Sequence, residues 1–216
     1  MIPLRHGRVS IALHALREAE GPTLLCLHAV GGSARDFREA ARLWPGPVYA
    51  LDFAGHGDSG PLRGGGYHPE LLAGDADAAL ARIGPARLAG AGVGAYVALL
   101  LAGSRADAIA GALLLPGAGL TGGGPAPAPE SVGSVHWTDL GPPPAGCDPA
   151  VRRLERDPRP PDYADAFARA ARRLLLAEGD FPRPPWWEAV RASPTAAPAP
   201  GDLASGLARL GSLTLE

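Results

Sequence analysis

The sequence predicts a single α/β domain: a three-layer sandwich in which a mostly parallel central sheet lies between two layers of helices. Short apolar runs alternate with glycine-rich turns and with segments of helical periodicity, and strands that alternate with helices pair in parallel. The 216 residues are enough to bury one substantial core. We therefore expect residues 1–216 to form one domain.

The first two predicted strands each end in a glycine-containing loop. Thr23–His28 is a short apolar run that breaks into the turn Ala29–Ser33, and Pro47–Asp52 is a second run that leads into the loop Phe53–Gly60. Runs of this length that stop at glycine are typical of buried strands in a parallel sheet.

The next elements bring the chain to a distinctive glycine series. Pro69–Ile83 carries apolar residues near helical spacing. A strand that ends at the run Gly90–Gly94 follows, then a helix over Tyr96–Ala102 and a further strand over Ile109–Leu115.

The order of these elements resembles the α/β-hydrolase superfamily over roughly residues 9–116. The loop after Asp52 is similar to the family's D-x-x-G-H-G-x-S loop, and Ala29–Ser33 follows a histidine as in its H-G-x-G-G oxyanion loop. In that family the frame G-x-S-x-G forms a sharp strand-to-helix turn that presents the nucleophilic serine. In this chain the frame is intact, but Gly92 stands where the serine would be.

Two of the three positions of the catalytic triad are therefore degenerate. Gly92 has no side chain with which to form an acyl intermediate. If the second half of the chain completes the sheet, the resemblance places the triad acid at Asp139, and the segment Gly179–Pro182 is similar to a G-H-F-P motif in which Asp180 replaces the basic histidine. If it instead forms a lid, the sequence does not encode the base. A carboxylate replaces an imidazole base at neutral pH only if its pKa is strongly raised.

Residues 131–216 allow two interpretations. In the favoured one the sheet is completed with little or no lid; its elements are a strand over Ser134–Thr138, a helix over Pro161–Ala171, a final strand over Arg173–Ala177, and helices over Pro185–Ala192 and Asp202–Leu210. In the other, Asp148–Ser193 is a helical lid and Ser212–Leu215 begins an incomplete strand. We favour the first because the second leaves an apolar sheet edge exposed.

What the resemblance leaves is a binding site without its attacking groups. The N–H of Val93 at the start of a helix, with a second donor from Val30 or Ala29, would form an oxyanion hole that binds a carbonyl or carboxylate without reacting. The residues expected to contact this ligand are His28, Ala29, Val30, Gly31, His56 and Val93. The two histidines are expected to organise the loops rather than to move protons.

The leading hypothesis is accordingly a non-catalytic protein that binds a small ligand or a partner. The alternative is an active, esterase-like hydrolase with a displaced nucleophile or an Asp/water mechanism. For the latter the relevant carboxylates are Asp52, Asp139 and Asp180. Three residues are candidates for a displaced nucleophile, and each has a simpler structural role: Cys26 in the core, Ser33 as a helix cap and Ser59 in a turn.

Composition excludes several other classes of function. A formal charge of −2 without a basic run disfavours nucleic acid or an anionic membrane as partner. No apolar run reaches the length of a membrane span, and the first residues lack a signal-peptide pattern, so we expect a cytoplasmic protein with free thiols at Cys26 and Cys147. No cofactor is expected, because lysine is absent and the glycine series lacks the third glycine of a dinucleotide loop. No metal is expected either, because Asp139, Cys147, Asp148, Glu155 and Asp157 do not have the spacing of a ligand motif.

Overall fold

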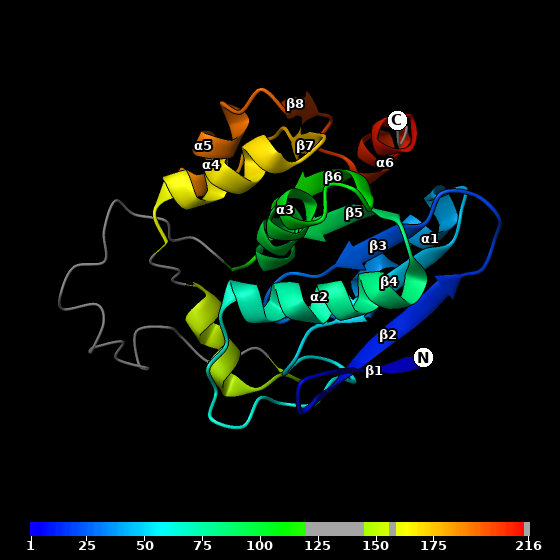
Figure 1. Ribbon diagram of the computed structural model, residues 1–216, viewed down its shortest axis with the longest axis vertical. Helices are drawn as coiled ribbons and strands as arrows, with labels where there is room; N and C mark the ends of the chain where they lie inside the picture. The colour runs from blue at the N-terminus through cyan, green and yellow to red at the C-terminus, as the bar shows by residue number, and fades with distance from the viewer. Residues whose placement is uncertain (120–144, 156–158, 214–216) are drawn as a thin grey trace.

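The described part of the chain forms a twisted eight-stranded sheet with the strand order β1-β2-β4-β3-β5-β6-β7-β8 (Figure 1). The computed structural model describes residues 1–119, 145–155 and 159–213. The strands are β1 (Ile2–His6), β2 (Val9–Arg17), β3 (Leu24–Leu27), β4 (Val48–Asp52), β5 (Ala86–Ala91), β6 (Ile109–Leu115), β7 (Leu174–Ala177) and β8 (Ala196–Ala199). The pairs β1–β2 and β2–β4 are antiparallel, and all the other pairs are parallel.

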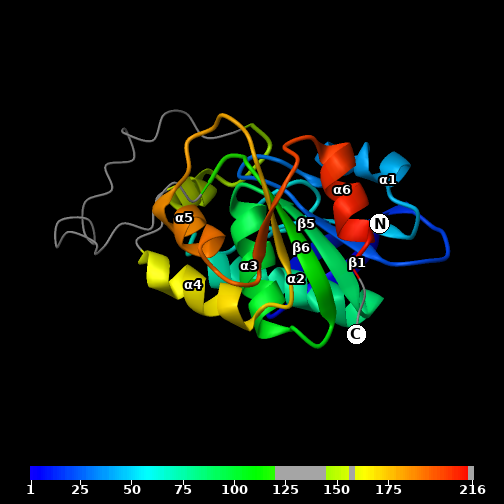
Figure 2. The same cartoon turned by 90° about the horizontal axis from the view of Figure 1, so that it is seen from above.

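Helices cover both faces of this sheet, which gives the three layers that the sequence predicts (Figures 1 and 2). They are the 3₁₀ helix η1 (Ala34–Phe37), α1 (Ala40–Leu43), α2 (Pro69–Ile83), α3 (Val93–Ser104), the 3₁₀ helix η4 (Pro149–Glu155), α4 (Pro161–Ala170), α5 (Pro185–Arg191) and α6 (Leu203–Gly211). One core cluster joins the sheet to α2, α3, α4 and α5. The other joins it to η1, α1 and α6.

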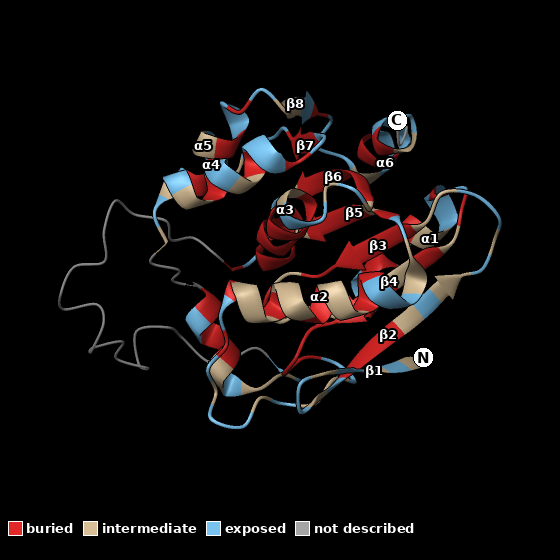
Figure 3. Ribbon diagram, in the orientation of Figure 1, coloured by how far each residue is buried: buried red, intermediate tan, exposed pale blue. Residues whose placement is uncertain are grey.

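The centre of the core is the unit β5–α3–β6, which also carries the glycine frame (Figure 3). Every residue of β3 and all but the last of β6 are buried, as expected for strands covered on both faces. Helix α3 is buried from Val93 to Ala102 and is apolar on all sides, because α2 and α4 flank it on the same face of the sheet.

The second half of the chain confirms most of the favoured interpretation and corrects its end. The helices expected over 161–171, 185–192 and 202–210 are α4, α5 and α6, within two residues at each boundary. Arg173–Ala177 was expected to be the final strand, and this is wrong: β8 follows it and pairs in parallel with β7. The strand expected over Ser134–Thr138 lies outside the described residues.

The lid interpretation is contradicted by the sheet. Residues 174–177, which it assigns to a lid, pair with β6 inside the sheet. Ser212, where it begins a strand, is the C-terminal cap of α6. Between β6 and β7 the described helices are η4 and α4, and α4 packs on α3 beside the sheet. None of the described helices has the length and hydrophobicity needed to cross a bilayer.

Candidate functional site

The sharp turn after β5 has kept the backbone of a nucleophile elbow. Gly92 is the N-cap of α3, with φ 55° and ψ −120°, a conformation that strains residues other than glycine. A Cβ atom at Gly90 would lie 2.2 Å from the carbonyl oxygen of Gly94, and one at Gly94 would lie 2.1 Å from that of Leu27. Glycine at both positions is thus required by the close approach of α3 to β3 and β5.

The place of a nucleophilic side chain is occupied by backbone from another segment. A Cβ atom at Gly92 would lie 2.1 Å from the carbonyl oxygen of Ala118 and 2.7 Å from the carbonyl carbon of Gly117. Both residues belong to the turn that follows β6, which we call the 116–119 turn (Pro116–Gly119). A side chain at position 92 fits only if this turn moves.

The same turn supplies the acceptor for two N–H groups that were expected to form an oxyanion hole. The N–H of Val30 donates to the carbonyl oxygen of Ala118 at 3.1 Å, and the N–H of Val93 donates to the same oxygen at 3.0 Å. The structure thus points the Val93 and Val30 donors at a single oxygen, and that oxygen belongs to the chain itself. At Ala29, by contrast, the carbonyl accepts a hydrogen bond from the N–H of Gly32 at 3.0 Å, which closes the tight turn through Gly31.

The two histidines of the glycine loops are buried and bonded to backbone. Nδ1–H of His28 donates to the carbonyl of Ala29 at 2.7 Å, while Nε2 accepts the N–H of Phe53 at 3.1 Å. Burial, together with the neighbouring ring of His56, lowers the pKa of His28 to about 3. Nδ1–H of His56 donates to the carbonyl of Ala54 at 3.2 Å, and burial also lowers its pKa. Both rings are neutral around pH 7, and His28 joins the two loops.

Asp52 is the second anchor of these loops. Its Oδ1 accepts the N–H of Ala34 at 2.7 Å, and its Oδ2 accepts the N–H of Asp58 at 2.8 Å and a hydrogen bond from His14 at 2.9 Å. Although burial acts to raise the pKa of this carboxyl group, the hydrogen bonds from Asp58, Ala34 and His14 outweigh it and lower the pKa. Asp52 is therefore an ionised carboxylate at the end of β4 whose two oxygens both accept hydrogen bonds.

The candidate displaced nucleophiles have structural partners. Cys26 is fully buried in β3, and burial raises the pKa of its thiol. The hydroxyl of Ser33 caps η1 in a capping box with Asp36. The hydroxyl of Ser59 donates to the carbonyl of Asp52 at 2.5 Å and accepts the N–H of Ala12 at 2.8 Å.

One three-residue group of potential metal ligands occurs within the described ranges. Ligand atoms of His14, Asp52 and Asp58 lie within 4.8 Å of one another, at a separate hollow of about 320 Å³. Of the acidic and thiol group that the sequence singled out, Asp139 and Asp157 lie outside the described residues. Asp148 accepts the hydroxyl of Tyr67 at 2.8 Å and the N–H of Ala150 at 2.9 Å, as expected for a residue that caps η4.

An apolar cavity of about 180 Å³ opens beside Gly92. It is lined by Gly92, Leu115, Pro116, Gly117, Gly119, Phe181, Pro182, Pro184, Trp186 and Trp187. The aromatic residues of this lining pack edge-to-face, with Trp186–Trp187 at 5.3 Å and Trp187–Phe181 at 5.4 Å between centroids. Tyr96, which does not line the cavity, packs edge-to-face on Trp186 at 5.0 Å. The two tryptophans, expected from the sequence to pack in the core, are buried and also form a wall of this cavity.

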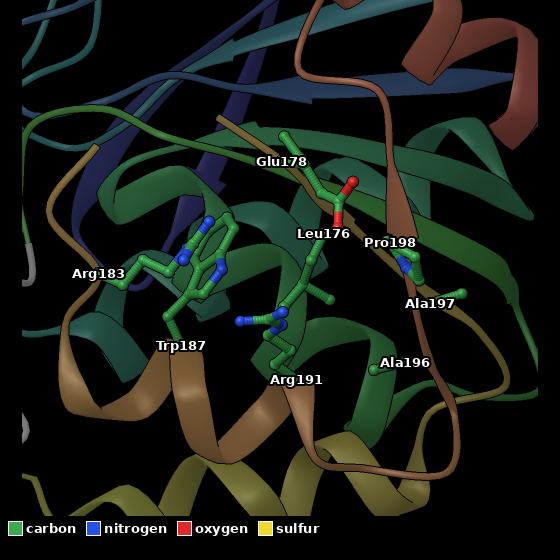
Figure 4. A pocket seen from close by; sticks show the side chains of 9 residues that line it. Leu176, Glu178, Arg183, Trp187, Arg191, Ala196, Ala197 and Pro198 are labelled. Atoms are coloured by element: carbon green, nitrogen blue, oxygen red, sulfur yellow. The ribbon is translucent and has the colours of Figure 1, made fainter. Parts of the chain in front are cut away.

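A second cavity of about 160 Å³ lies on the other side of Trp187, between α5 and the edge strand β8 (Figure 4). Trp187 and Arg191 extend into it from α5, and Glu178 and Arg183 contribute from the loop between β7 and α5. A carboxylate oxygen of Glu188 lies 3.9 Å from Nε of Arg183, and the other lies 3.6 Å from Nη1 of Arg191. Glu188 and Glu178 together balance the two positive charges around this cavity.

Of the two further residues that the resemblance assigns to the triad, Asp180 lies in the described part of the chain. Asp180 is exposed in the loop after β7 and does not line the cavity beside Gly92; Asp139 lies outside the described residues. Triad members follow one another as nucleophile, acid and base in chain order in this fold, and the last histidine of the sequence is His136. Residues 174–216 therefore contain no histidine.

Comparison with known proteins gives the fold. No family model and no curated protein sequence matches this chain. Among solved structures, the bottromycin epimerase BotH in complex with bottromycin A2 is similar with a TM-score of 0.62 and 20% identity, covering 97% of this chain and 93% of that one.

Two further structural neighbours are named as a thioesterase domain and a putative aryl esterase. A thioesterase domain from the curacin biosynthetic pathway has a TM-score of 0.67 and 19% identity, with 98% and 97% of the two chains covered. A putative aryl esterase from Burkholderia cenocepacia has a TM-score of 0.69 and 18% identity, with 91% and 88% covered. The chain has the α/β-hydrolase fold over nearly its whole length.

Proposed function

We propose that this protein is a non-catalytic member of the α/β-hydrolase fold that binds a small ligand in the apolar cavity beside Gly92. The observation that carries the proposal is the pairing of Gly92 with the 116–119 turn: the nucleophile is missing, and Ala118 occupies its place. Losing a triad nucleophile or base reduces turnover by about a million-fold. The turnover rate that remains is too low for a dedicated esterase.

Other parts of the site support the same conclusion. The thiol of Cys26 and the hydroxyls of Ser33 and Ser59 are buried or hydrogen-bonded in structural roles. His28 and His56 are neutral rings held by backbone groups. One structural neighbour is an epimerase, so this fold is compatible with functions other than ester hydrolysis.

The size and lining of the cavity indicate the chemistry of the ligand. An engineered apolar cavity of about 150 Å³ in another protein binds benzene, and the cavity beside Gly92 measures about 180 Å³. A wall built from Phe181, Trp186 and Trp187 favours a flat apolar group. We propose a ligand with one ring or a short acyl chain that also carries a carbonyl or carboxylate. This group reaches the Val30 and Val93 donors only when the Ala118 carbonyl is displaced from them.

Binding is tested with fluorobenzene observed by ¹⁹F NMR. Saturable line broadening is expected with the wild-type protein and a weaker affinity with Phe181→Ala, which removes a half-buried ring from the cavity wall. Phe167→Ala is the matched control, because Phe167 is also half-buried and packs edge-to-face on Tyr163, away from the cavity. Absence of saturable binding, or equal affinities in both variants, contradicts the proposed site.

Hydrolysis is tested with a panel of p-nitrophenyl esters. The wild-type protein is expected to release p-nitrophenol no faster than buffer. Saturable turnover that disappears in Asp180→Ala would instead establish the alternative, an active hydrolase that uses a carboxylate and water.

A further inference from the structure

We propose that the 116–119 turn is an autoinhibitory element whose Ala118 carbonyl acts as an internal ligand of the oxyanion hole. The carbonyl oxygen accepts hydrogen bonds from Val30 at 3.1 Å and from Val93 at 3.0 Å. These are two backbone donors from loops at the carboxyl ends of β3 and β5, and a single acceptor satisfies both. Two donors converging on one oxygen form the arrangement that binds an oxyanion or a carbonyl in an acyl-transfer site.

The turn is fitted closely to the walls of the hole. Gly119 has φ +98°, and a Cβ atom there would lie 2.6 Å from Cγ2 of Val30 and 2.9 Å from Cβ of Val93. A Cβ atom at Gly117 would lie 2.8 Å from the nitrogen of Gly92. Glycine at these positions is what allows the Ala118 carbonyl to reach both donors, so the contact depends on the sequence of the turn.

The turn is also coupled to the apolar cavity. Pro116, Gly117 and Gly119 line that cavity together with Trp186 and Trp187 of α5. A ligand group in the cavity therefore contacts the turn directly. A ligand that carries a carbonyl or carboxylate must displace Ala118 before it reaches Val30 and Val93, because the hole holds one oxygen at a time.

This competition lowers the affinity for such ligands in a definite way. If only a fraction of molecules has the turn displaced, the apparent dissociation constant of a carboxylate ligand rises by the inverse of that fraction. An apolar ligand that fills the cavity without entering the hole does not compete with the Ala118 carbonyl for the two donors. The inference rests on the proposed ligand-binding function for its biological meaning, but the contact itself is testable without a ligand.

The test compares Gly119→Ala with Gly64→Ala. Gly119→Ala forces the turn away from Val30 and Val93. Gly64 has nearly the same backbone strain, with φ +96°, and nothing lies within 4 Å of the added Cβ atom. Amide hydrogen exchange at Val30 and Val93 is expected to be slow in the wild-type protein and in Gly64→Ala, and about tenfold faster or more in Gly119→Ala.

Ligand probes complete the test. Phenylacetate is expected to gain about tenfold in affinity relative to toluene when Gly119→Ala is compared with the wild type. Toluene has no acceptor for the two donors and therefore reports the change in the cavity wall alone. Gly117→Ala provides a second way to displace the turn should Gly119→Ala fail to fold.

The outcomes separate this inference from the proposed function. Unchanged exchange at Val30 and Val93 together with an unchanged ratio of phenylacetate affinity to toluene affinity overturns the autoinhibitory contact. If exchange rises as expected but neither toluene nor phenylacetate binds any variant, the contact stands and the ligand-binding function fails.

Discussion

Replacing Gly92 with serine restores the G-x-S-x-G frame and, by the geometry of the site, destabilises the protein without creating an esterase. The substitution has two costs. A residue with a side chain at φ 55° and ψ −120° carries about 1–3 kcal/mol of backbone strain. The new Cβ atom, 2.1 Å from the Ala118 oxygen, also expels the 116–119 turn and breaks its two hydrogen bonds, each worth about 0.5–1.5 kcal/mol net.

We therefore expect Gly92→Ser to lower the free energy of unfolding by about 4 kcal/mol, a large fraction of the 5–15 kcal/mol typical of a domain. The matched control is Gly7→Ser. Gly7 has φ 57° and an open environment, with nothing within 4 Å of an added Cβ atom, so it reports the strain of a left-handed φ without the clash.

The assay is urea unfolding followed by circular dichroism, together with hydrolysis of p-nitrophenyl esters and labelling by an activated phosphonate. Gly92→Ser is expected to be less stable than Gly7→Ser and to show neither turnover nor a phosphonate adduct. If it is as stable as Gly7→Ser, the turn does not occupy the nucleophile's place. If it hydrolyses esters, a working base is present and the non-catalytic assignment is wrong.

Two predictions concern pH. In the folded protein His28 is neutral, because burial and His56 lower its pKa from 6.5 to about 3. Between these two pH values the His28 ring is protonated in the unfolded chain but not in the folded protein. As pH falls from 6.5 toward 3, His28 therefore lowers the free energy of unfolding by up to about 1.4 kcal/mol per pH unit. Urea unfolding at a series of pH values is expected to show a shallower dependence in His28→Asn, and an identical dependence would contradict the burial argument. For Glu70, partial burial acts to raise the pKa, but hydrogen bonds from Arg159, Tyr163 and His68 lower it from 4.5 to about 2. Its stabilisation is present above pH 4.5 and is lost as pH falls toward 2, so Glu70→Gln is expected to flatten the stability profile in that window; a profile as steep as that of the wild type would argue against the network.

The sequence allowed the first half of the fold to be predicted because its local and global signals agree. Apolar runs such as Leu24–Leu27 and Val48–Asp52 end in glycine turns, and both are buried strands in the structure. The capping role of Ser33 and the core position of Cys26 were predicted from residue type and position, and the structure has both.

The last strand could not be predicted because its sequence has little β propensity. Ala196–Ala199 reads A-A-P-A, with alanine and proline in place of branched residues. Proline is tolerated in a strand only at an edge, where no neighbouring strand needs its missing N–H, and β8 is the edge strand of the sheet. Partners in the sheet, rather than local preference, make this segment a strand.

The occupant of the oxyanion hole was also missed. Val93 and Val30 were predicted as donors because they follow the frame of the fold, but their acceptor comes from a turn more than twenty residues further along. A signal was present in the run Pro116–Gly119: small residues with glycine on both sides of Ala118 are what a close backbone approach requires. Such a run indicates that another part of the chain lies close to its backbone, but it does not identify which part.

The backbone geometry of the turn at Gly92 depends on the close packing of α3 against the sheet. Gly94 lets α3 approach the carbonyl of Leu27, and Gly90 lets the first turn of α3 fold over the end of β5. These contacts hold the buried helix against the centre of the sheet whether or not residue 92 carries a hydroxyl. Under the proposed function, glycine at position 92 leaves this scaffold intact and leaves space for the Ala118 carbonyl to reach both donors. In this reading Gly92 and the 116–119 turn depend on each other, and recovering a hydrolase requires changing both as well as supplying a base.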